Sequence, residues 1–192
     1  MNTEEDLHPG KIKIVITYLE MRNRPQPREL TPPSAKIKIT PAINPTVTFY
    51  RYLYNTVGAP WLWYDRRKMS DEQLRDIIQN PKVEIYVLYV DGVPAGYAEL
   101  DRRHEMDIEL AYFGIMLEFI GQRLGPFLLN WIIEKAWSYN PQRFWLHTCT
   151  LDHPKALAVY QQAGFVPYKQ EEKIIDDPHA SDVVEKRSAA HR

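Results

Sequence analysis

The stretch from Glu109 to Leu129 is the part of the sequence best suited to binding a phosphate group. It starts as an apolar run, passes through a turn that contains Gly121 and Gly125, and continues into an apolar helical pattern behind Pro126. A strand that enters a helix through such a turn leaves backbone N–H groups unpaired at the positive end of the helix dipole, and both features attract anions. The same turn also serves as a simple chain reversal, so the pattern alone indicates only a candidate site.

A histidine and a cysteine make a second candidate pair. His147 and Cys149 stand two residues apart in a segment that is typical of a strand, so they share one face and could act as a base and a thiol nucleophile. We set this interpretation aside because a buried strand cysteine is usually inert and no third group that would orient the histidine is apparent. The six histidines show no ligand spacing with carboxylates or with the cysteine, and we predict no metal.

The elements that would position these residues are a mixture of strands and helices. Runs of β-branched and aromatic residues predict strands over residues 11–19, 36–40, 83–90, 93–100, 106–115, 143–150 and 165–175. Apolar residues at helical spacing predict helices over residues 46–57, 70–80, 125–140 and 152–164. Ser70 and Gln73 form a capping-box pattern, and Asp91-Gly92 predicts a tight hairpin turn. Residues 58–68, rich in aromatic and basic side chains, are predicted to be irregular and partly exposed.

Size and composition indicate one ordinary globular domain. The chain has 192 residues, of which 44% are hydrophobic and 26% charged, and we expect a single domain over 10–175 between a loose tail (1–9) and a disordered tail (176–192). The net charge of −1 argues against a nucleic-acid or membrane partner. The single cysteine rules out an intramolecular disulfide, and without a secretory signal or a membrane-length apolar run we expect a cytoplasmic protein. The sequence does not decide between a monomer and a homodimer.

This order of elements, together with three local patterns, resembles the GNAT superfamily, the N-acetyltransferases that use acetyl-CoA, over roughly residues 10 to 175. The first pattern is Ile120-Gly-Gln-Arg123-Leu-Gly125, where the family carries Gln/Arg-x-x-Gly-x-Gly/Ala and its backbone amides hold the CoA pyrophosphate. Gly125 fits strictly, whereas Ile120 replaces the Gln/Arg and Arg123 replaces the first Gly. Arg123 could add a guanidinium donor to the phosphates or could crowd them, and we favour an intact, reshaped site.

The second pattern lies in the segment that ends at Phe165. It resembles a pattern of the family that consists of an Asn, an Ala three residues later, a Tyr four residues after that, and then a Gly-Phe pair. The matching residues here are His153, Ala156, Tyr160, Gly164 and Phe165. The resemblance implies that Tyr160 is the general acid that protonates the leaving thiolate, although a tyrosine on such a helix can equally be a core residue. His153 would take over the Asn's contact with the pantetheine, or would only cap the helix.

The third pattern is Glu109, six residues before Ile115 on the strand that would lie beside the cofactor. In histone-modifying members of the family a Glu at this place deprotonates the attacking amine, so the resemblance implies the same role for Glu109. The alternatives are a solvated glutamate or a salt bridge to Arg102 or Arg103, and Glu99 on the neighbouring strand would be the first substitute as base.

The resemblance implies an α/β fold, a central mixed and mostly antiparallel sheet flanked by helices. It implies an N-acetyltransferase that moves an acetyl group from acetyl-CoA to a primary amine of a small molecule or peptide by direct attack. The implied cofactor-binding residues are Ile115, Met116, Leu117, Gly121, Gln122, Arg123, Leu124, Gly125, Pro126 and His153. Trp61, Trp63, Tyr64 and Arg66 would bind the acceptor or would only pack the first helices. The alternative function is a non-catalytic acyl-CoA sensor or protein-interaction module of the same fold.

Overall fold

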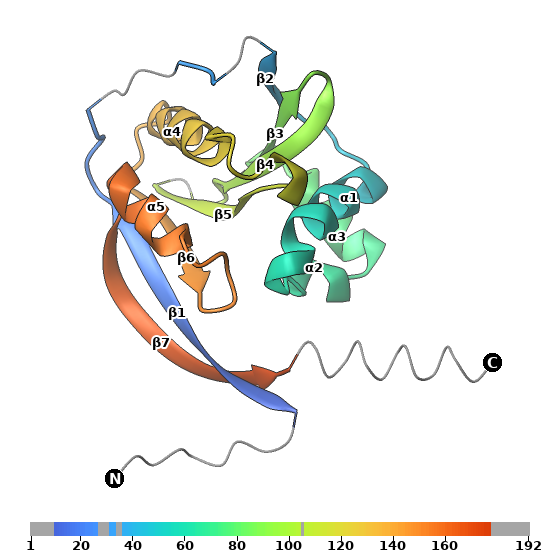
Figure 1. Ribbon diagram of the computed structural model, residues 1–192, viewed down its shortest axis with the longest axis vertical. Coiled ribbons are helices and arrows are strands. Elements are labelled where there is room, and N and C mark those ends of the chain that lie inside the picture. The colour runs from blue at the N-terminus through green and yellow to red at the C-terminus, as the bar shows by residue number, and fades with distance from the viewer. Residues whose placement is uncertain (1–9, 27–30, 34–35, 105, 178–192) are drawn as a thin grey trace, which may run out of the picture.

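The structure is a seven-stranded mixed sheet with helices on both faces (Figure 1). The computed structural model describes residues 10–26, 31–33, 36–104 and 106–177. The strands are β1 (Lys11–Met21), β2 (Ile37–Pro41), β3 (Val83–Val90), β4 (Val93–Asp101), β5 (Asp107–Ile115), β6 (Arg143–Cys149) and β7 (Val166–Asp176). The helices are α1 (Val47–Gly58), α2 (Asp65–Lys68), α3 (Asp71–Ile78), α4 (Leu124–Trp137) and α5 (Ala156–Ala163), with 3-10 turns η1 (Ala59–Trp61) and η2 (Leu117–Phe119).

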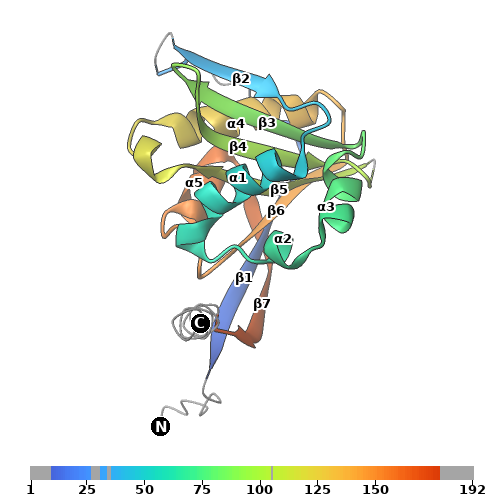
Figure 2. The ribbon, with the colours of Figure 1, turned by 90° about the vertical axis from the view of Figure 1, so that its right-hand side faces the viewer.

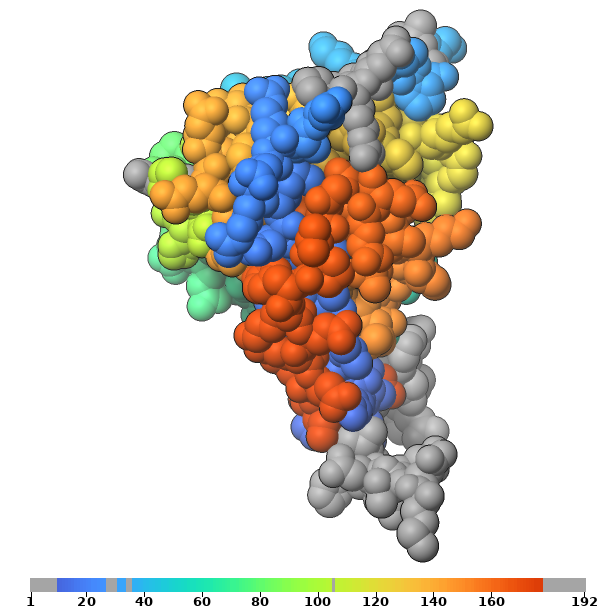
Figure 3. All heavy atoms as spheres, turned by 90° about the vertical axis from the view of Figure 1, so that its left-hand side faces the viewer, coloured from blue at the N-terminus to red at the C-terminus, as the bar shows by residue number. Residues whose placement is uncertain are grey.

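The strand order is β2-β3-β4-β5-β6-β1-β7, and every neighbouring pair is antiparallel except β5 and β6, which are parallel. The prediction of a mixed, mostly antiparallel sheet is therefore confirmed. β1 lies between β6 and β7, so the first strand of the chain joins the sheet beside its last two. Figure 3 shows β7 along the outer surface next to β1.

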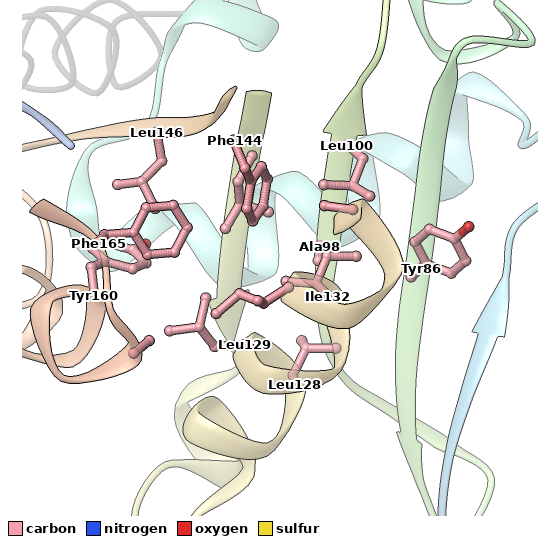
Figure 4. Packing of buried hydrophobic residues seen from close by; sticks show 14 of the residues in the cluster. Tyr86, Ala98, Leu100, Leu128, Leu129, Ile132, Phe144, Leu146, Tyr160 and Phe165 are labelled. Atoms are coloured by element: carbon pink, nitrogen blue, oxygen red, sulfur yellow. The ribbon is translucent and has the colours of Figure 1, made fainter. Parts of the chain in front are cut away.

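Two apolar clusters hold the helices to the sheet. α4 and α5 cover one face, where Leu110, Leu128 and Phe144 belong to the larger cluster (Figure 4). α1 and α3 cover the other face, where Tyr50 and Leu74 belong to the second cluster. Figure 2 shows that these first helices lie in front of β3, β4 and β5, while β1 and β7 extend past them. Part of this second face, over β1 and β7, therefore lies beyond α1 and α3.

The parallel pair β5–β6 is short, and this determines the shape of the centre of the domain. The two strands pair at three positions, Asp107 with Arg143, Ile108 with Phe144, and Glu109 with Trp145. β5 runs on to Ile115 along β4, and β6 runs on to Cys149 along β1. The strands thus part after Glu109 and leave a wedge that opens toward their carboxyl ends, which we call the β5–β6 wedge.

The local sequence signals are confirmed for most elements. Ser70 and Gln73 make both hydrogen bonds of the capping box at the start of α3, and Asp91-Gly92 makes the turn between β3 and β4, with both residues at positive φ. Residues 58–68 differ from the prediction, because they contain η1 and α2 and bury the side chain of Arg66. α5 also begins later than predicted, at Ala156, since the carboxylate of Asp152 is bound by the end of β6 and does not cap the helix.

Within the described ranges, none of the helices combines the length and the apolar character needed to cross a bilayer. The tail predicted for residues 1–9 lies outside the described residues. Of the tail predicted for residues 176–192, Asp176 is the last residue of β7, and everything beyond Asp177 lies outside the described residues.

Candidate active site

The β5 edge that faces the wedge is open. Among the described residues, no strand pairs with this edge beyond Glu109, although the opposite edge of β5 is paired with β4 as far as Ile115. An unpaired strand edge offers alternating N–H and C=O groups, and an extended chain with amide groups can add to it as a further strand.

A β-bulge within β5 decides which side chains face the wedge from each side of the sheet. Leu110 pairs with Leu100 and Tyr112 pairs with Glu99, so Ala111 is the extra residue. Because of the bulge, Leu110 and Phe113 both face α4 and α5, whereas Tyr112 turns toward α1. No local pattern in the sequence marks this bulge.

The turn between β5 and α4 keeps its backbone amides available. Gly121 has φ of 89° and Arg123 has φ of 59°, so both occupy the left-handed region. Among the described residues, the N–H groups of 121–125 donate to no backbone acceptor, and the first such bond of the helix start runs from Phe127 to Arg123. Glycine adopts the left-handed conformation at little cost, while another residue loses roughly 1 kcal/mol there. Arg123 therefore has the backbone geometry that suits the glycine of the family signature.

A cavity of about 580 Å³ adjoins this turn. Its lining residues are Thr31, Pro32, Pro33, Gly121, Gln122, Arg123, Pro126, Phe127 and Asn130. Arg123 is the one charged residue among them, so the cavity has the electrostatic character that a phosphate group needs. Thr31 to Pro33, which form one wall of the cavity, belong to the connection between β1 and β2. The sequence did not predict this wall, because no local pattern relates residues that are 90 positions apart.

Glu109 lies at the apex of the wedge, as the last β5 residue that pairs with β6. Its side chain is 23% exposed, and its Oε1 atom lies 3.6 Å from Nδ1 of His147. The predicted alternative of a salt bridge to Arg102 or Arg103 is wrong, because these side chains pair with Glu84 and Asp101. No lysine or arginine in the described ranges forms an ion pair with Glu109, so its carboxylate can meet a cation from outside.

Tyr160 comes to the other side of the wedge from α5. Its ring lies 6.1 Å from that of Phe113 on β5 and 6.3 Å from that of Phe165, centroid to centroid (Figure 4). Burial raises the pKa of Tyr160, and the nearby Asp152 carboxylate raises it further. The phenol therefore stays protonated at neutral pH and can donate a proton.

Two indoles join the α1–α2 connection to the loop before α5. Trp63 Nε1 donates to Oδ1 of Asp152 at 3.2 Å, and the ring of Trp61 meets that of His153 edge-on at 4.9 Å. Nδ1 of His153 also accepts from the N–H of Lys155. Trp63 further packs against Tyr112 at 5.2 Å. Thus Trp61 and Trp63 contact the loop that carries His153, and much of their surface is used within the protein.

Arg66 is placed inside the domain. Its guanidinium donates to Oε1 of Glu99 at 2.7 Å, and the Tyr50 hydroxyl donates to Oε2 of the same carboxylate at 2.5 Å. Arg66 is 7% exposed and Glu99 is fully buried. Burial raises the pKa of Glu99, and Arg66 offsets part of this effect. Arg66 is therefore shielded from any acceptor, and Glu99, with both oxygens bonded, is a poor substitute for Glu109 as a base.

The remaining candidates have ordinary surroundings. Tyr64 receives the ammonium of Lys68 over its ring at 4.3 Å. His147 and Cys149 share the face opposite the α4–α5 cluster, as expected, and burial raises the pKa of the Cys149 thiol, which makes it a weaker nucleophile. Among the described residues, no group of three or more His, Cys, Asp or Glu side chains is arranged to hold a metal ion.

Comparison with known proteins gives a family match over most of the domain. The model of the Acetyltransferase (GNAT) family matches residues 50–165, which contain the wedge, the turn and Tyr160. No curated protein sequence matches the chain.

Solved structures share the fold at low sequence identity. A functionally unknown conserved protein from Staphylococcus epidermidis aligns with 17% identity and a TM-score of 0.61, over 88% of this chain and 63% of that one. A GCN5-related N-acetyltransferase from Kribbella flavida aligns with 17% identity and a TM-score of 0.59, over 90% and 63%. An aminoglycoside acetyltransferase from an uncultured soil metagenomic sample aligns with 11% identity and a TM-score of 0.55, over 67% and 88%. The chain spans slightly under two-thirds of the first two proteins.

Proposed function

The chain belongs to the GNAT acetyltransferase family, and from this premise we propose that it is an N-acetyltransferase that uses acetyl-CoA to acetylate a primary amine. The observation that carries the proposal is the continuity of the open β5 edge with the amide-rich turn at 121–125. An acyl-CoA has an amide-containing arm followed by a diphosphate, and these two chemical features match the edge and the turn in that order along the chain.

The residues that would hold the donor follow from this match. The backbone of Ile115, Met116 and Leu117 continues the open edge toward the turn, and Gly121 to Gly125 supply N–H groups to the diphosphate. Pro126 removes one N–H from the start of α4, but the four residues before it retain theirs. The cavity beside Arg123 gives the diphosphate and the groups beyond it room next to a single positive charge. His153 would contact the arm from the loop before α5.

The donor supplies a thioester, and in the transfer the amine nitrogen forms a bond to its carbonyl carbon while the carbon–sulfur bond breaks. Glu109 takes the proton that the amine must lose, because an ammonium group has no lone pair for attack. Tyr160 gives its proton to the leaving thiolate and is later reprotonated from solvent. The products are an amide and a free thiol, with one proton released overall from the protonated amine.

A thiol-release assay over a panel of primary amines, amino acids and peptides tests this function. We expect acetyl-CoA turnover that depends on the amine, with an acetylated amine identified by mass spectrometry. Release of CoA that does not depend on any amine would show hydrolysis only, and no release across the panel would contradict the proposal.

A second function, an acyl-CoA sensor without turnover, is motivated by Ile120 and Arg123 in the signature. Tyr160→Phe separates the two functions. For an enzyme we expect kcat to fall roughly tenfold with acetyl-CoA affinity unchanged, since the thiolate of CoA is already a fair leaving group and gains only modestly from an acid. Thiol release at saturating amine measures the first quantity and calorimetry the second. A sensor would bind acetyl-CoA without any turnover to lose.

The side chain at position 123 decides between a reshaped and a degraded site. Arg123→Gly keeps a residue that tolerates the left-handed φ of 59° and removes the guanidinium. We expect CoA affinity to fall by roughly three- to tenfold, because a charge-assisted contact to phosphate is lost at an exposed position. Calorimetric titration with CoA measures this change, and Arg123→Lys is the control that keeps the charge. Tighter binding by the glycine variant would mean that Arg123 obstructs the phosphates.

A further inference from the structure

Aromatic side chains from β1, β6 and β7 form a continuous group on the sheet face opposite α4 and α5. Tyr18 of β1 lies 6.4 Å from Trp145 and 5.7 Å from His147, both on β6, measured between ring centroids. Trp145 and His147 stack at 6.3 Å, and Tyr168 of β7 lies 6.2 Å from Tyr18. We call these four residues the aromatic face. They come from three adjacent strands, and strand register places Tyr18 directly opposite His147.

The aromatic face is accessible and adjoins the apex of the wedge. The side chain of His147 is 46% exposed, and Tyr168 is 43% exposed. Trp145 pairs with Glu109 in the sheet, and parallel partners point their side chains to the same side, so the Glu109 carboxylate borders the aromatic face. Exposed aromatic clusters of this kind are typical of binding sites rather than of ordinary surface.

The charges around the aromatic face leave one carboxylate without a cationic partner. Arg143, whose guanidinium lies 5.6 Å from the Trp145 ring, is held by Asp107 at 2.7 Å. Lys169, over the Tyr18 ring, pairs with Glu171. Among the described residues, His147 is the only basic side chain within ion-pair distance of Glu109. A ligand that brings a positive charge to Glu109 would therefore gain an ion pair that no lysine or arginine in the described part of the chain supplies.

We propose that the aromatic face is the acceptor site and that the acceptor is an arylalkylamine, a primary amine on a short chain from an aromatic ring. The ring packs against Trp145 and Tyr18, and the ammonium group meets Glu109, which then removes its proton. This inference rests on the proposed function and names its substrate class. It replaces the α1–α2 connection as the acceptor site, because Arg66 is buried there and Trp63 is bonded to Asp152.

The same charges predict discrimination against amino acids. A free amino acid carries a carboxylate one carbon from its amine, and at this site that carboxylate would lie near Glu109. The basic side chains that the structure describes beside the aromatic face, Arg143 and Lys169, are already paired with Asp107 and Glu171. Like charges at this separation repel each other. The site should thus favour tryptamine over tryptophan and phenethylamine over phenylalanine, although each pair shares its ring.

The test compares four amines in the thiol-release assay: tryptamine, tryptophan, phenethylamine and ethylamine. We expect kcat/KM for tryptamine to exceed that for tryptophan or for ethylamine by roughly tenfold or more. The aromatic contact accounts for the difference from ethylamine, and the avoided charge repulsion accounts for the difference from tryptophan. Trp145→Ala should raise the KM for tryptamine and so remove most of its advantage over ethylamine. Tyr52→Ala, which removes an exposed tyrosine of α1 outside this face, is the matched control.

The outcomes separate this inference from the function on which it rests. The aromatic face is not the acceptor site if amines are acetylated with no preference for a ring. It is also not the site if Trp61→Ala abolishes the preference and Trp145→Ala keeps it. Either result leaves the proposed acetyltransferase function unaffected. Failure of every amine to release thiol would overturn both. If Trp145→Ala unfolds, Tyr168→Ala repeats the test at a more exposed ring, where a rise of roughly threefold in the KM for tryptamine is expected.

Discussion

Glu109→Gln is expected to lower kcat at pH 7 by roughly 10²-fold or more, because the variant cannot accept the proton of the bound ammonium. A primary alkylamine has a pKa near that of lysine, about 10.4, so only about one molecule in 10³ is neutral at pH 7. Acetyl-CoA affinity should stay within about twofold, since Glu109 lies on the face opposite α4 and its turn and the change preserves its shape. Steady-state thiol release and calorimetry measure the two effects.

The pH dependence of this variant is the sharper observation. As pH rises toward the pKa of the free amine, more of the amine arrives already neutral, so the deficit of Glu109→Gln should shrink steadily. Glu72→Gln, at an exposed position on α3 far from the wedge, controls for the loss of one carboxylate. A deficit that stays constant from pH 7 to pH 10 would show that Glu109 binds or positions the acceptor without removing its proton.

Arg66→Met is expected to destabilise the fold by about 3–5 kcal/mol, because it leaves the buried Glu99 carboxylate without its guanidinium partner. The ion pair lies at 2.7 Å, with 8% and 0% of the two side chains exposed, so water cannot replace the lost contact. Arg67→Met is the control, since its exposed side chain makes a single hydrogen bond within the described residues, to Oδ1 of Asn55, and it should cost less than about 1 kcal/mol. Urea unfolding of both variants measures the difference.

The sign of the pH effect follows from the pKa of Glu99. Burial already raises this pKa in the native protein, and removal of Arg66 raises it further. A carboxyl whose pKa is higher in the folded state stabilises the fold when protonated, and that contribution is lost as pH rises through the folded-state pKa. The Arg66→Met deficit should therefore be largest at neutral pH and should shrink as pH falls through the raised folded-state pKa of Glu99 in the variant, above the ordinary glutamate pKa of about 4.3. Glu99→Gln in the same chain should remove this pH dependence.

Local sequence patterns predict the elements of this fold well and their neighbours in space poorly. The hairpin of β3 and β4 and the cap of α3 depend on residues within a few positions of each other, and both are confirmed. The place of β1 between β6 and β7 depends on pairing over more than a hundred residues, which no local pattern encodes. The bulge at Ala111 is equally hidden, because residues 110–115 are all apolar or glycine and show no alternation that would mark a change of face.

The same distinction between local and long-range signals applies to the candidate site. The turn at 121–125 could be predicted because glycine spacing and a helix start are local signals, and the structure adds that Arg123 adopts a left-handed backbone. The sequence predicts an exposed Arg66, because the segment 58–68 is rich in aromatic and basic residues and is bounded by Gly and Pro. Its true surroundings are set by Glu99, 33 positions away. The aromatic face was missed for the same reason, since its rings come from β1, β6 and β7.

Titration of the chain with acetyl-CoA in a calorimeter tests the central claim most directly, that the β5–β6 wedge and the turn at 121–125 form an acyl-CoA site. We predict saturable binding with one site per chain and a dissociation constant below about 1 mM, which corresponds to roughly −4 kcal/mol. Binding should weaken when an acidic residue is placed at the turn by Gln122→Glu, because the diphosphate then meets a negative charge. Absence of binding at millimolar acetyl-CoA, or binding that Gln122→Glu leaves unchanged, would contradict it.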